Sequence, residues 1–219
     1  MNQAYSRSSD IMNPGAARPV SIIGCGSIGS FVAPTLAKMG FTHFHLYDGD
    51  KVGEENIGCQ GFGWSDLGKS KVEALKTRLV AESPVQPDNV ITHNEMVTDK
   101  TKLPFILTVL GLDSMAARKL VWDKLNGNVP YLVDGRIGGQ VIRVFGVLPN
   151  YEYAAYYEKY LYDDEQAAEL PCTRRNVSYV ANLTAGLMGS MVREFATNGV
   201  TVKEYGWDVE HPASFYYKE

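Results

Sequence analysis

The sequence is poor in cysteine and histidine and has no long basic run. Three cysteines and four histidines are spread along 219 residues, too few and too scattered for a disulfide-stabilised scaffold or a zinc site. The formal net charge of -4 and the absence of basic clusters argue against a nucleic-acid-binding surface. We therefore expect no structural zinc and no nucleic-acid partner.

The sequence also lacks membrane and secretion signals. No stretch approaches the roughly 20 apolar residues that a bilayer-spanning helix needs. Residues 1–18 are polar and lack the apolar centre of a signal peptide. We expect a cytoplasmic protein with no membrane partner.

The most informative motif is G-x-G-x-x-G, formed by Gly24, Gly26 and Gly29. Apolar residues precede the motif, and residues 28, 32, 36 and 39 after it are apolar at helical spacing. Glycines let backbone amides approach a phosphate, and a helix N-terminus adds partial positive charge there. The motif therefore predicts a nucleotide site without specifying the nucleotide or the reaction.

Strand and helix patterns alternate along the chain, which predicts one α/β domain with a Rossmann-like, mostly parallel sheet. Expected strands are 19–24, 44–48, 105–112 and 131–133, and expected helices are 27–39, 71–80, 114–125 and 181–196. Residues 140–148 alternate in polarity and predict an antiparallel extension. We divide the chain into an N-terminal arm (1–18), a core (19–200) that includes the segment 150–175, and a C-terminal tail (201–219).

Asp48 ends the second expected strand, 19 residues beyond Gly29. An acidic residue at this place can bind ribose hydroxyls. Proteins that bind NAD and proteins that bind ATP share the arrangement. The glycine motif and Asp48 together predict a bound adenosine and leave the reaction open.

Residues 63–70 match the P-loop expression G-x-x-x-x-G-K-S. A functional P-loop follows a buried strand. The preceding residues 54–62 are polar and glycine-rich, so we favour a chance match.

Several motifs, taken in order, resemble those of the ThiF/MoeB/HesA family, which includes the ubiquitin-activating enzymes. The resemblance covers almost the whole chain and depends on the combination. Its elements are Tyr5-Ser-Arg7, Asp48-Gly-Asp50-Lys-Val52, Asn56, Gln60, Asp66-Leu-Gly68-Lys69-Ser-Lys71 and Asp113-Ser-Met-Ala-Ala-Arg118.

The resemblance implies a homodimeric enzyme that uses ATP and Mg²⁺ to adenylate the C-terminal glycine of a small ubiquitin-like or sulfur-carrier protein. It implies that Asp48 binds the ribose, that Asn56 and Lys71 bind the phosphates, and that Asp113 holds Mg²⁺ and is catalytic with Lys71. Arg7 would reach across the dimer as an arginine finger. The other residues expected at the ATP site are Gly24, Gly26, Gly29, Asp50 and Gln60.

The chain departs from the family pattern at two places. Cys59 occupies the position of an arginine that precedes Gln60 in the family, so one phosphate-binding cation is missing. Arg118, Arg136 or Lys69 could replace it, and Arg136 is a candidate because it follows a buried strand, where α/β folds place ligand contacts. Many relatives also hold zinc with two C-x-x-C pairs, which three cysteines cannot form.

Cys172 is the candidate nucleophile. Pro171-Cys172-Thr173 resembles the catalytic cysteine motif of ubiquitin-activating enzymes, and the two arginines that follow favour the reactive thiolate. This resemblance implies a thioester on Cys172, which would pass the carrier to a conjugating enzyme; otherwise the adenylate would go to a sulfur donor. The tyrosines between residues 151 and 162 fit a protein interface and core packing equally well.

Two other functions remain open at this point. A small NAD-binding oxidoreductase shares the glycine motif and Asp48, but it does not account for Asn56, Lys71 and Asp113 together. A non-catalytic partner subunit of the same family would account for the loss of the arginine at position 59.

Overall fold

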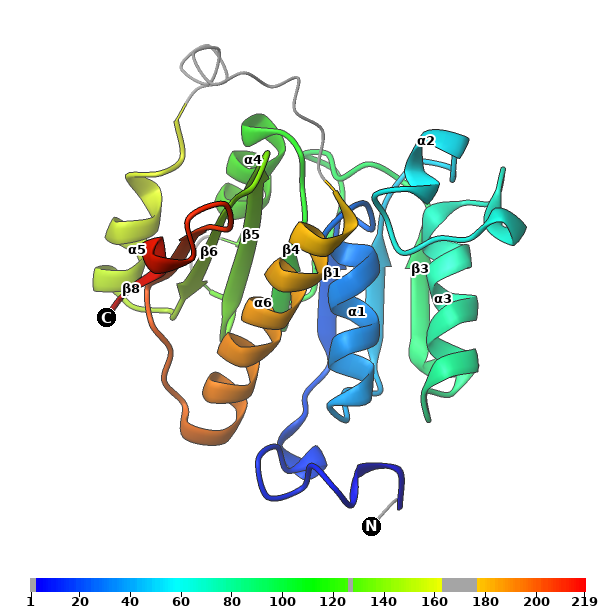
Figure 1. The fold of residues 1–219 in the computed structure, drawn as a ribbon, viewed down its shortest axis with the longest axis horizontal. Helices are drawn as coiled ribbons and strands as arrows, with labels where there is room; N and C mark the ends of the chain where they lie inside the picture. Colours follow the sequence, from blue (N-terminus) through cyan, green and yellow to red (C-terminus); the bar gives the residue numbers. More distant parts are fainter. Residues whose placement is uncertain (1–2, 126–127, 163–176) are drawn as a thin grey trace.

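A computed structural model describes residues 3–125, 128–162 and 177–219. Its eight-stranded sheet has the order β3-β2-β1-β4-β5-β6-β7-β8 (Figure 1). The first five strands in this order pair in parallel and the last three pair antiparallel, so the predicted α/β fold with an antiparallel extension is confirmed. The strands are β1 (Val20–Ile23), β2 (Phe44–Tyr47), β3 (Val90–His93), β4 (Leu107–Leu110), β5 (Leu132–Gly138), β6 (Val141–Val147), β7 (Glu204–Asp208) and β8 (Tyr216–Lys218).

Helices cover both faces of this sheet. Successive strand residues point to opposite faces, and Ile22 accordingly joins the larger apolar cluster under α1, α3 and α6, whereas Ile23 joins the smaller cluster under α4 and α5. The helices are α1 (Gly29–Lys38), α2 (Glu54–Ile57), α3 (Lys71–Glu82), α4 (Met115–Leu125), α5 (Tyr151–Glu158) and α6 (Ser178–Asn198). In the described ranges, no helix has the length and apolar character needed to cross a membrane.

Several parts of the fold differ from the sequence-based expectation. Strand β3 was not predicted, because it is short and exposes Ile91 at the edge of the sheet. Helix α2 lies in a segment for which no helix or strand was predicted, and residues 201–219, treated as a tail, provide the strands β7 and β8.

The tyrosine-rich segment forms helix α5 and packs on the core. The Asn150 side chain caps this helix by accepting a hydrogen bond from the Tyr153 amide. Tyr157 is fully buried, and the Tyr156 hydroxyl donates to the buried Glu204. Packing thus accounts for these two tyrosines, whereas Tyr151 is exposed.

The N-terminal arm is anchored at the end of α1 that lies away from the glycine motif. The Tyr5 hydroxyl donates to the carbonyl of Ala37 (3.2 Å), and Met12 is buried in the core. The arm therefore lies at the opposite edge of the molecule from α2 and from the start of α6 (Figure 1).

Helix α1 contains Pro34, which has no N–H to donate to the carbonyl of Ser30. The Arg78 guanidinium of α3 supplies the missing donor, because its Nη1 lies 3.1 Å from the Ser30 oxygen and 2.8 Å from the carbonyl oxygen of Gly61. The Ser30 hydroxyl accepts from the Gly61 amide at 2.8 Å. Arg78 thus connects α1, α3 and the loop after α2.

We expect Arg78→Ala to lower the free energy of unfolding by about 1–3 kcal/mol, because it leaves two carbonyls without a donor. Adding Pro34→Ala should recover about 1 kcal/mol of this loss, since an alanine at this position restores the helical N–H. Urea denaturation of both single variants and the double variant measures the coupling. Arg193→Ala, which removes an arginine that pairs with its neighbour Glu194 on the surface of α6, is the control and should change stability by less than about 0.5 kcal/mol; additive effects of the two substitutions would contradict this account.

Candidate functional site

Two glycines of the motif are required by backbone packing. Gly24 has a φ of +87°, and a Cβ atom there would lie 2.6 Å from the carbonyl oxygen of Gly111 at the end of β4. A Cβ atom on Gly29 would lie 2.0 Å from the Gly24 oxygen. These contacts bring the N-terminus of α1 to the carboxyl ends of β1 and β4.

Gly26 differs because nothing in the described part of the protein requires it to be a glycine. The atoms nearest to a Cβ placed there belong to the Gln60 amide, at 3.9 and 4.0 Å. The Gln60 Oε1 atom is buried and has no hydrogen-bond partner among the described residues. The space over Gly26 and this unpartnered oxygen fit a ligand with hydrogen-bond donors that approaches the backbone closely.

Asp48 links the glycine turn to the loop that follows β2. Its Oδ2 accepts a hydrogen bond from the Cys25 amide and its Oδ1 from the Asp50 amide, both at 2.8 Å. Burial raises the pKa of Asp48, although these two hydrogen bonds and the charge of Lys71 act in the opposite direction. Asp48 thus lies just after β2 and is hydrogen-bonded to the glycine turn.

Lys71 is a buried lysine at the start of α3, with 7% of its surface exposed. Its Nζ lies 2.8 Å from Asp50 Oδ2, and its backbone N–H donates to the Asp50 carbonyl at 3.0 Å. An ordinary surface lysine would extend into solvent. Cys25, Asp48, Asp50 and Lys71 therefore form one continuous chain of polar contacts beside the open space over Gly26.

The α2 segment closes the site from another direction. Asn56 lies in α2 and its Oδ1 accepts from the Gly53 amide at 2.9 Å. The Ser27 hydroxyl of the glycine turn donates to the Cys59 carbonyl at 3.0 Å. Position 59 thus adjoins the turn, and Cys59, which is half-buried, supplies no positive charge there.

The structure does not place every expected residue at this site. Asp113 is exposed in the segment between β4 and α4, two residues beyond the Gly111 contact. Arg7 is exposed in the N-terminal arm, far from the glycine turn of its own chain, so it could serve only the site of a second copy. Cys172 and the two arginines after it lie outside the described residues.

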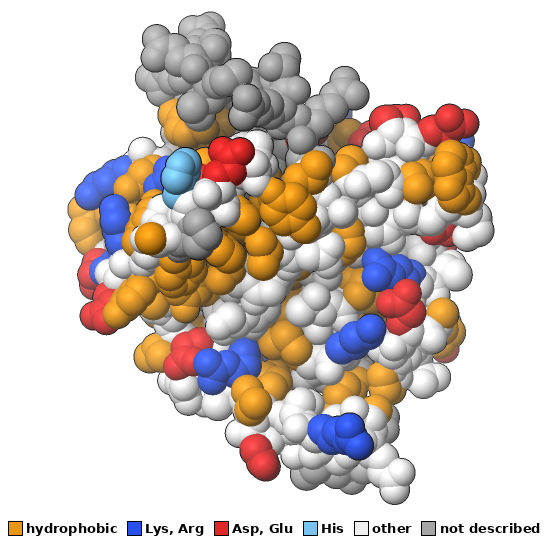
Figure 2. All heavy atoms as spheres, in the orientation of Figure 1, with side chains coloured by type: hydrophobic (Ala, Val, Ile, Leu, Met, Phe, Trp, Pro, Cys, Tyr) orange, Lys and Arg blue, Asp and Glu red, His pale blue; other side chains and the backbone are white. Residues whose placement is uncertain are grey.

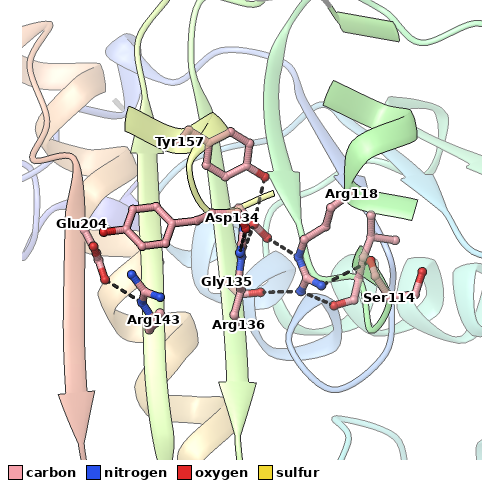
Figure 3. A network of polar contacts seen from close by, with 10 residues as sticks. Ser114, Arg118, Asp134, Gly135, Arg136, Arg143, Tyr157 and Glu204 are labelled. Carbon is pink, nitrogen blue, oxygen red and sulfur yellow. Dashed lines mark hydrogen bonds and ion pairs between the residues drawn. The ribbon is translucent and has the colours of Figure 1, made fainter. Parts of the chain in front are cut away.

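A buried ion network adjoins the site on β5 and α4 (Figure 3). Asp134 is fully buried between Arg118 Nε at 3.1 Å and Arg136 Nε at 2.7 Å, and the Tyr157 hydroxyl donates to it at 3.0 Å. Burial by itself raises the pKa of Asp134, but the two guanidinium groups outweigh this effect and hold the pKa below its ordinary value. Sequence analysis missed Asp134, although a charged residue inside an apolar run is the pattern that could have found it.

The three cations considered as replacements for the missing arginine already have partners. Arg118 also donates to the carbonyls of Leu112 and Gly135, and Arg136 donates from Nη1 to the Tyr160 carbonyl at 2.7 Å. Arg136 Nη2 is buried without a partner among the described residues. Lys69 pairs with Asp66 at 3.3 Å on the surface. Each of the three cations thus contacts a carboxylate, although Arg118 and Arg136 share the single negative charge of Asp134.

The P-loop match at residues 63–70 lacks the required context. It contains the short 3-10 helix Trp64–Asp66 and ends at a single bridge between Lys51 and Ser70. The preceding element is α2 and not a strand. This agrees with the interpretation of the match as chance.

A groove of about 790 Å³ lies elsewhere, between α6 and β7. Figure 2 shows apolar side chains gathered on this side of the molecule. Its lining includes no residue expected at the nucleotide site and consists of Ser178, Tyr179, Asn182, Leu183, Gly186, Leu187 and Trp207.

Comparisons with known proteins give matches over most of the chain. A family model described as "ThiF family" matches residues 16–204. The Nedd8-activating enzyme E1 catalytic subunit of Drosophila melanogaster is 34% identical over 122 residues, which are 54% of this chain and 27% of that protein. Ubiquitin-like modifier-activating enzyme 5 of Drosophila mojavensis is 36% identical over 94 residues, which are 42% of this chain and 23% of that protein. The matches thus span about a quarter of these curated relatives.

Solved structures show the same fold. E. coli MccB with AMPCPP and MccA has a TM-score of 0.78 at 20% identity, covering 100% of this chain and 71% of that one. PaaA has a TM-score of 0.68 at 18% identity, covering 95% of this chain and 65% of that one. At these identities the likeness establishes the fold alone.

We expect Asp134→Asn to lower the free energy of unfolding by about 3–5 kcal/mol, because it leaves two buried arginines without a carboxylate. The lowered pKa means that the Asp134 contribution is present above the unfolded-state value of 3.8 and is lost as the pH falls through the lower folded-state value. Denaturant melts from pH 7 to pH 3 measure both effects. Asp66→Asn, which breaks the pair of Asp66 with Lys69 at the surface, is the control. It should lower the free energy of unfolding by less than about 1 kcal/mol; equal losses in the two variants would contradict this assignment.

Proposed function

Since the chain belongs to the ThiF family, we propose that it is an adenylating enzyme that uses ATP to activate the terminal carboxylate of a small protein or peptide. The observation that carries this proposal is the polar chain from Cys25 through Asp48 and Asp50 to Lys71, next to the open space over Gly26. It combines a carboxylate that can accept from a ribose, a glycine whose nearest neighbour is a side-chain amide, and a buried lysine, near the carboxyl ends of parallel strands.

Each residue has a proposed role toward ATP. Asp48 retains acceptor capacity for a ribose hydroxyl besides its two amide donors. The turn around Gly26 lies by the N-terminus of α1, where backbone N–H groups favour phosphate. Asn56 and Lys71 would bind phosphate oxygens, and Gln60 would pair its Oε1 with a donor of the bound substrates. Asp113, exposed at the end of β4, would hold Mg²⁺, which lowers the cost of bringing anions together.

The adenylation step needs positioning and charge stabilisation more than proton transfer. An oxygen of the substrate carboxylate bonds to the α-phosphorus, and the bond from this phosphorus to the bridging oxygen breaks, so that pyrophosphate leaves with the electron pair. No proton is transferred. Lys71 and the amides of the glycine turn would stabilise the charge that develops on the phosphate oxygens.

The finer proposals concern the acceptor and the assembly. We propose that the substrate is a small ubiquitin-like or sulfur-carrier protein ending in glycine, in line with the Nedd8-activating and ubiquitin-like modifier-activating relatives. The Cys172 thiolate would attack the activated carbonyl carbon, which forms a thioester and releases AMP; a conjugating enzyme or a sulfur donor would then take over the acyl group. A homodimer would bring Arg7 of one copy to the site of the other and supply the cation that Cys59 lacks.

The defining experiment is carrier-dependent exchange of labelled pyrophosphate into ATP. Candidate substrates are small carrier proteins ending in glycine and short peptides, the latter because MccB is solved with MccA. We expect exchange that Cys172→Ala retains, because the thiol acts after adenylation, and that Asp113→Ala and Lys71→Met reduce at least about 100-fold. ATP binding without exchange for any carrier would indicate a non-catalytic family member, and binding of NAD but not ATP would refute the proposal.

Gly26→Ala tests the opening directly. The added methyl group meets only the Gln60 amide at 3.9 Å or more, so the fold should tolerate it, while the methyl group enters the space proposed for phosphate. We expect an unchanged melting temperature and about tenfold weaker ATP binding, which corresponds to about 1.4 kcal/mol, measured by calorimetry. Gly29→Ala is the opposite control, because its clash with the Gly24 oxygen should lower stability by about 1–3 kcal/mol; unchanged ATP affinity in Gly26→Ala would refute this placement of the phosphates.

A further inference from the structure

Two histidines meet on adjacent strands below the proposed ribose site. His45 of β2 and His93 of β3 place Nδ1 and Nε2 3.3 Å apart. The Tyr47 ring stacks on His93 with centroids 4.0 Å apart and planes 1° from parallel. The proposed function assigns no role to this group.

The ring geometry indicates a hydrogen bond and not a metal site. The two imidazole centroids are 5.6 Å apart and their planes differ by 14°. The centroid separation exceeds the nitrogen separation by 2.3 Å (5.6 minus 3.3), about the width of an imidazole ring, so the two nitrogens point at each other. A metal ion bound to both would lie off this line at about 2.0–2.1 Å from each nitrogen. The pair therefore shares one hydrogen, with one ring as donor and the other as acceptor.

This shared hydrogen makes the pair sensitive to acid. A second proton would occupy the accepting nitrogen, break the bond and place two positive charges side by side. Burial lowers the pKa of both histidines, and His93 further lowers that of His45. Glu95, just after β3, acts to raise the pKa of His93 and so opposes the effect of burial. The pKa of Tyr47 is raised mainly by burial and further by Glu95. The neighbouring β1 residue at this register is Ser21, which carries no charge.

The pair is connected to Asp48 through the backbone. The Asp48 amide donates to the His93 carbonyl at 3.2 Å, and the Tyr47 carbonyl accepts from the Gly24 amide at 2.9 Å. β3 is an edge strand that pairs with β2 in the described sheet, so its position depends on its contacts with that strand. Separating His93 from His45 would therefore disturb the residue that the proposed function assigns to ribose.

We propose that His45 and His93 are positioning residues for Asp48, and that protonation of the pair loosens the nucleotide site. The expected effect on nucleotide binding rests on the proposed function. The expected effect on the Asp48 amide does not. Below about pH 6.5 the folded state binds fewer protons at these histidines than the unfolded state does, so the pair's contribution to stability falls as the pH falls.

The test measures amide hydrogen exchange of Asp48 by NMR at pH 7.5 and pH 5.5, corrected for the intrinsic rate, in the full chain. Protection should fall severalfold in the wild type, because protonation of the pair removes the hydrogen bond between His45 and His93. It should stay constant in His45→Phe, which keeps an aromatic ring and cannot titrate. His45→Asn serves as a second variant, because it keeps a polar group but does not take up a proton in this range.

His43→Phe is the matched control, because His43 is an exposed histidine two positions away that contacts Thr42 and not the pair. It should keep the wild-type pH response. Calorimetric binding of AMPCPP at the same two pH values should show the same pattern, and comparison with His45→Phe removes the separate titration of Asp48.

Equal pH responses in the wild type and His45→Phe would overturn the inference. A response of the Asp48 amide without AMPCPP binding at either pH would support the positioning role and refute the proposed function.

Discussion

The contact between three backbone segments at Gly24, Gly29 and Gly111 determines the rest of the site. A side chain at Gly24 or Gly29 would collide with backbone atoms, so the turn after β1 can approach the end of β4 only as a glycine turn. This approach brings the N-terminus of α1 next to the turn that carries Gly26. Asp48 accepts a hydrogen bond from the Cys25 amide of this turn, and Lys71 of α3 is joined to Asp48 through Asp50.

Ion pairs form separate groups around this space. Asp134 pairs with both Arg118 and Arg136 inside the protein, and these contacts hold β4, β5 and α4 together. Lys71 faces an Asp50 carboxylate whose side chain is half exposed, and water screens such a pair more than a buried one. Lys71 thus pairs with a carboxylate that solvent reaches, which suits a group that exchanges partners when a ligand binds.

Local sequence patterns predicted much of the fold and part of the site. The glycine motif, the buried strands and Asp48 followed from short-range periodicity and spacing. Strand β3, helix α5 and the strands β7 and β8 did not, because their stability depends on partners distant in the sequence, such as Glu204 for Tyr156 of α5. The same limit explains why Arg118 and Arg136 looked free in the sequence, since their partner Asp134 becomes a neighbour of Arg118 only in the folded sheet.

The pairing of Pro34 with Arg78 has an evolutionary consequence. A proline at position 34 leaves the Ser30 carbonyl without its helical donor, and the guanidinium from α3 compensates. In a lineage that acquired Arg78 before Pro34, the intermediate would keep a donor for the Ser30 carbonyl. In a lineage that acquired Pro34 first, the intermediate would lack this donor and would be less stable. The two positions are therefore epistatic, and one order of substitution is more accessible to selection than the other.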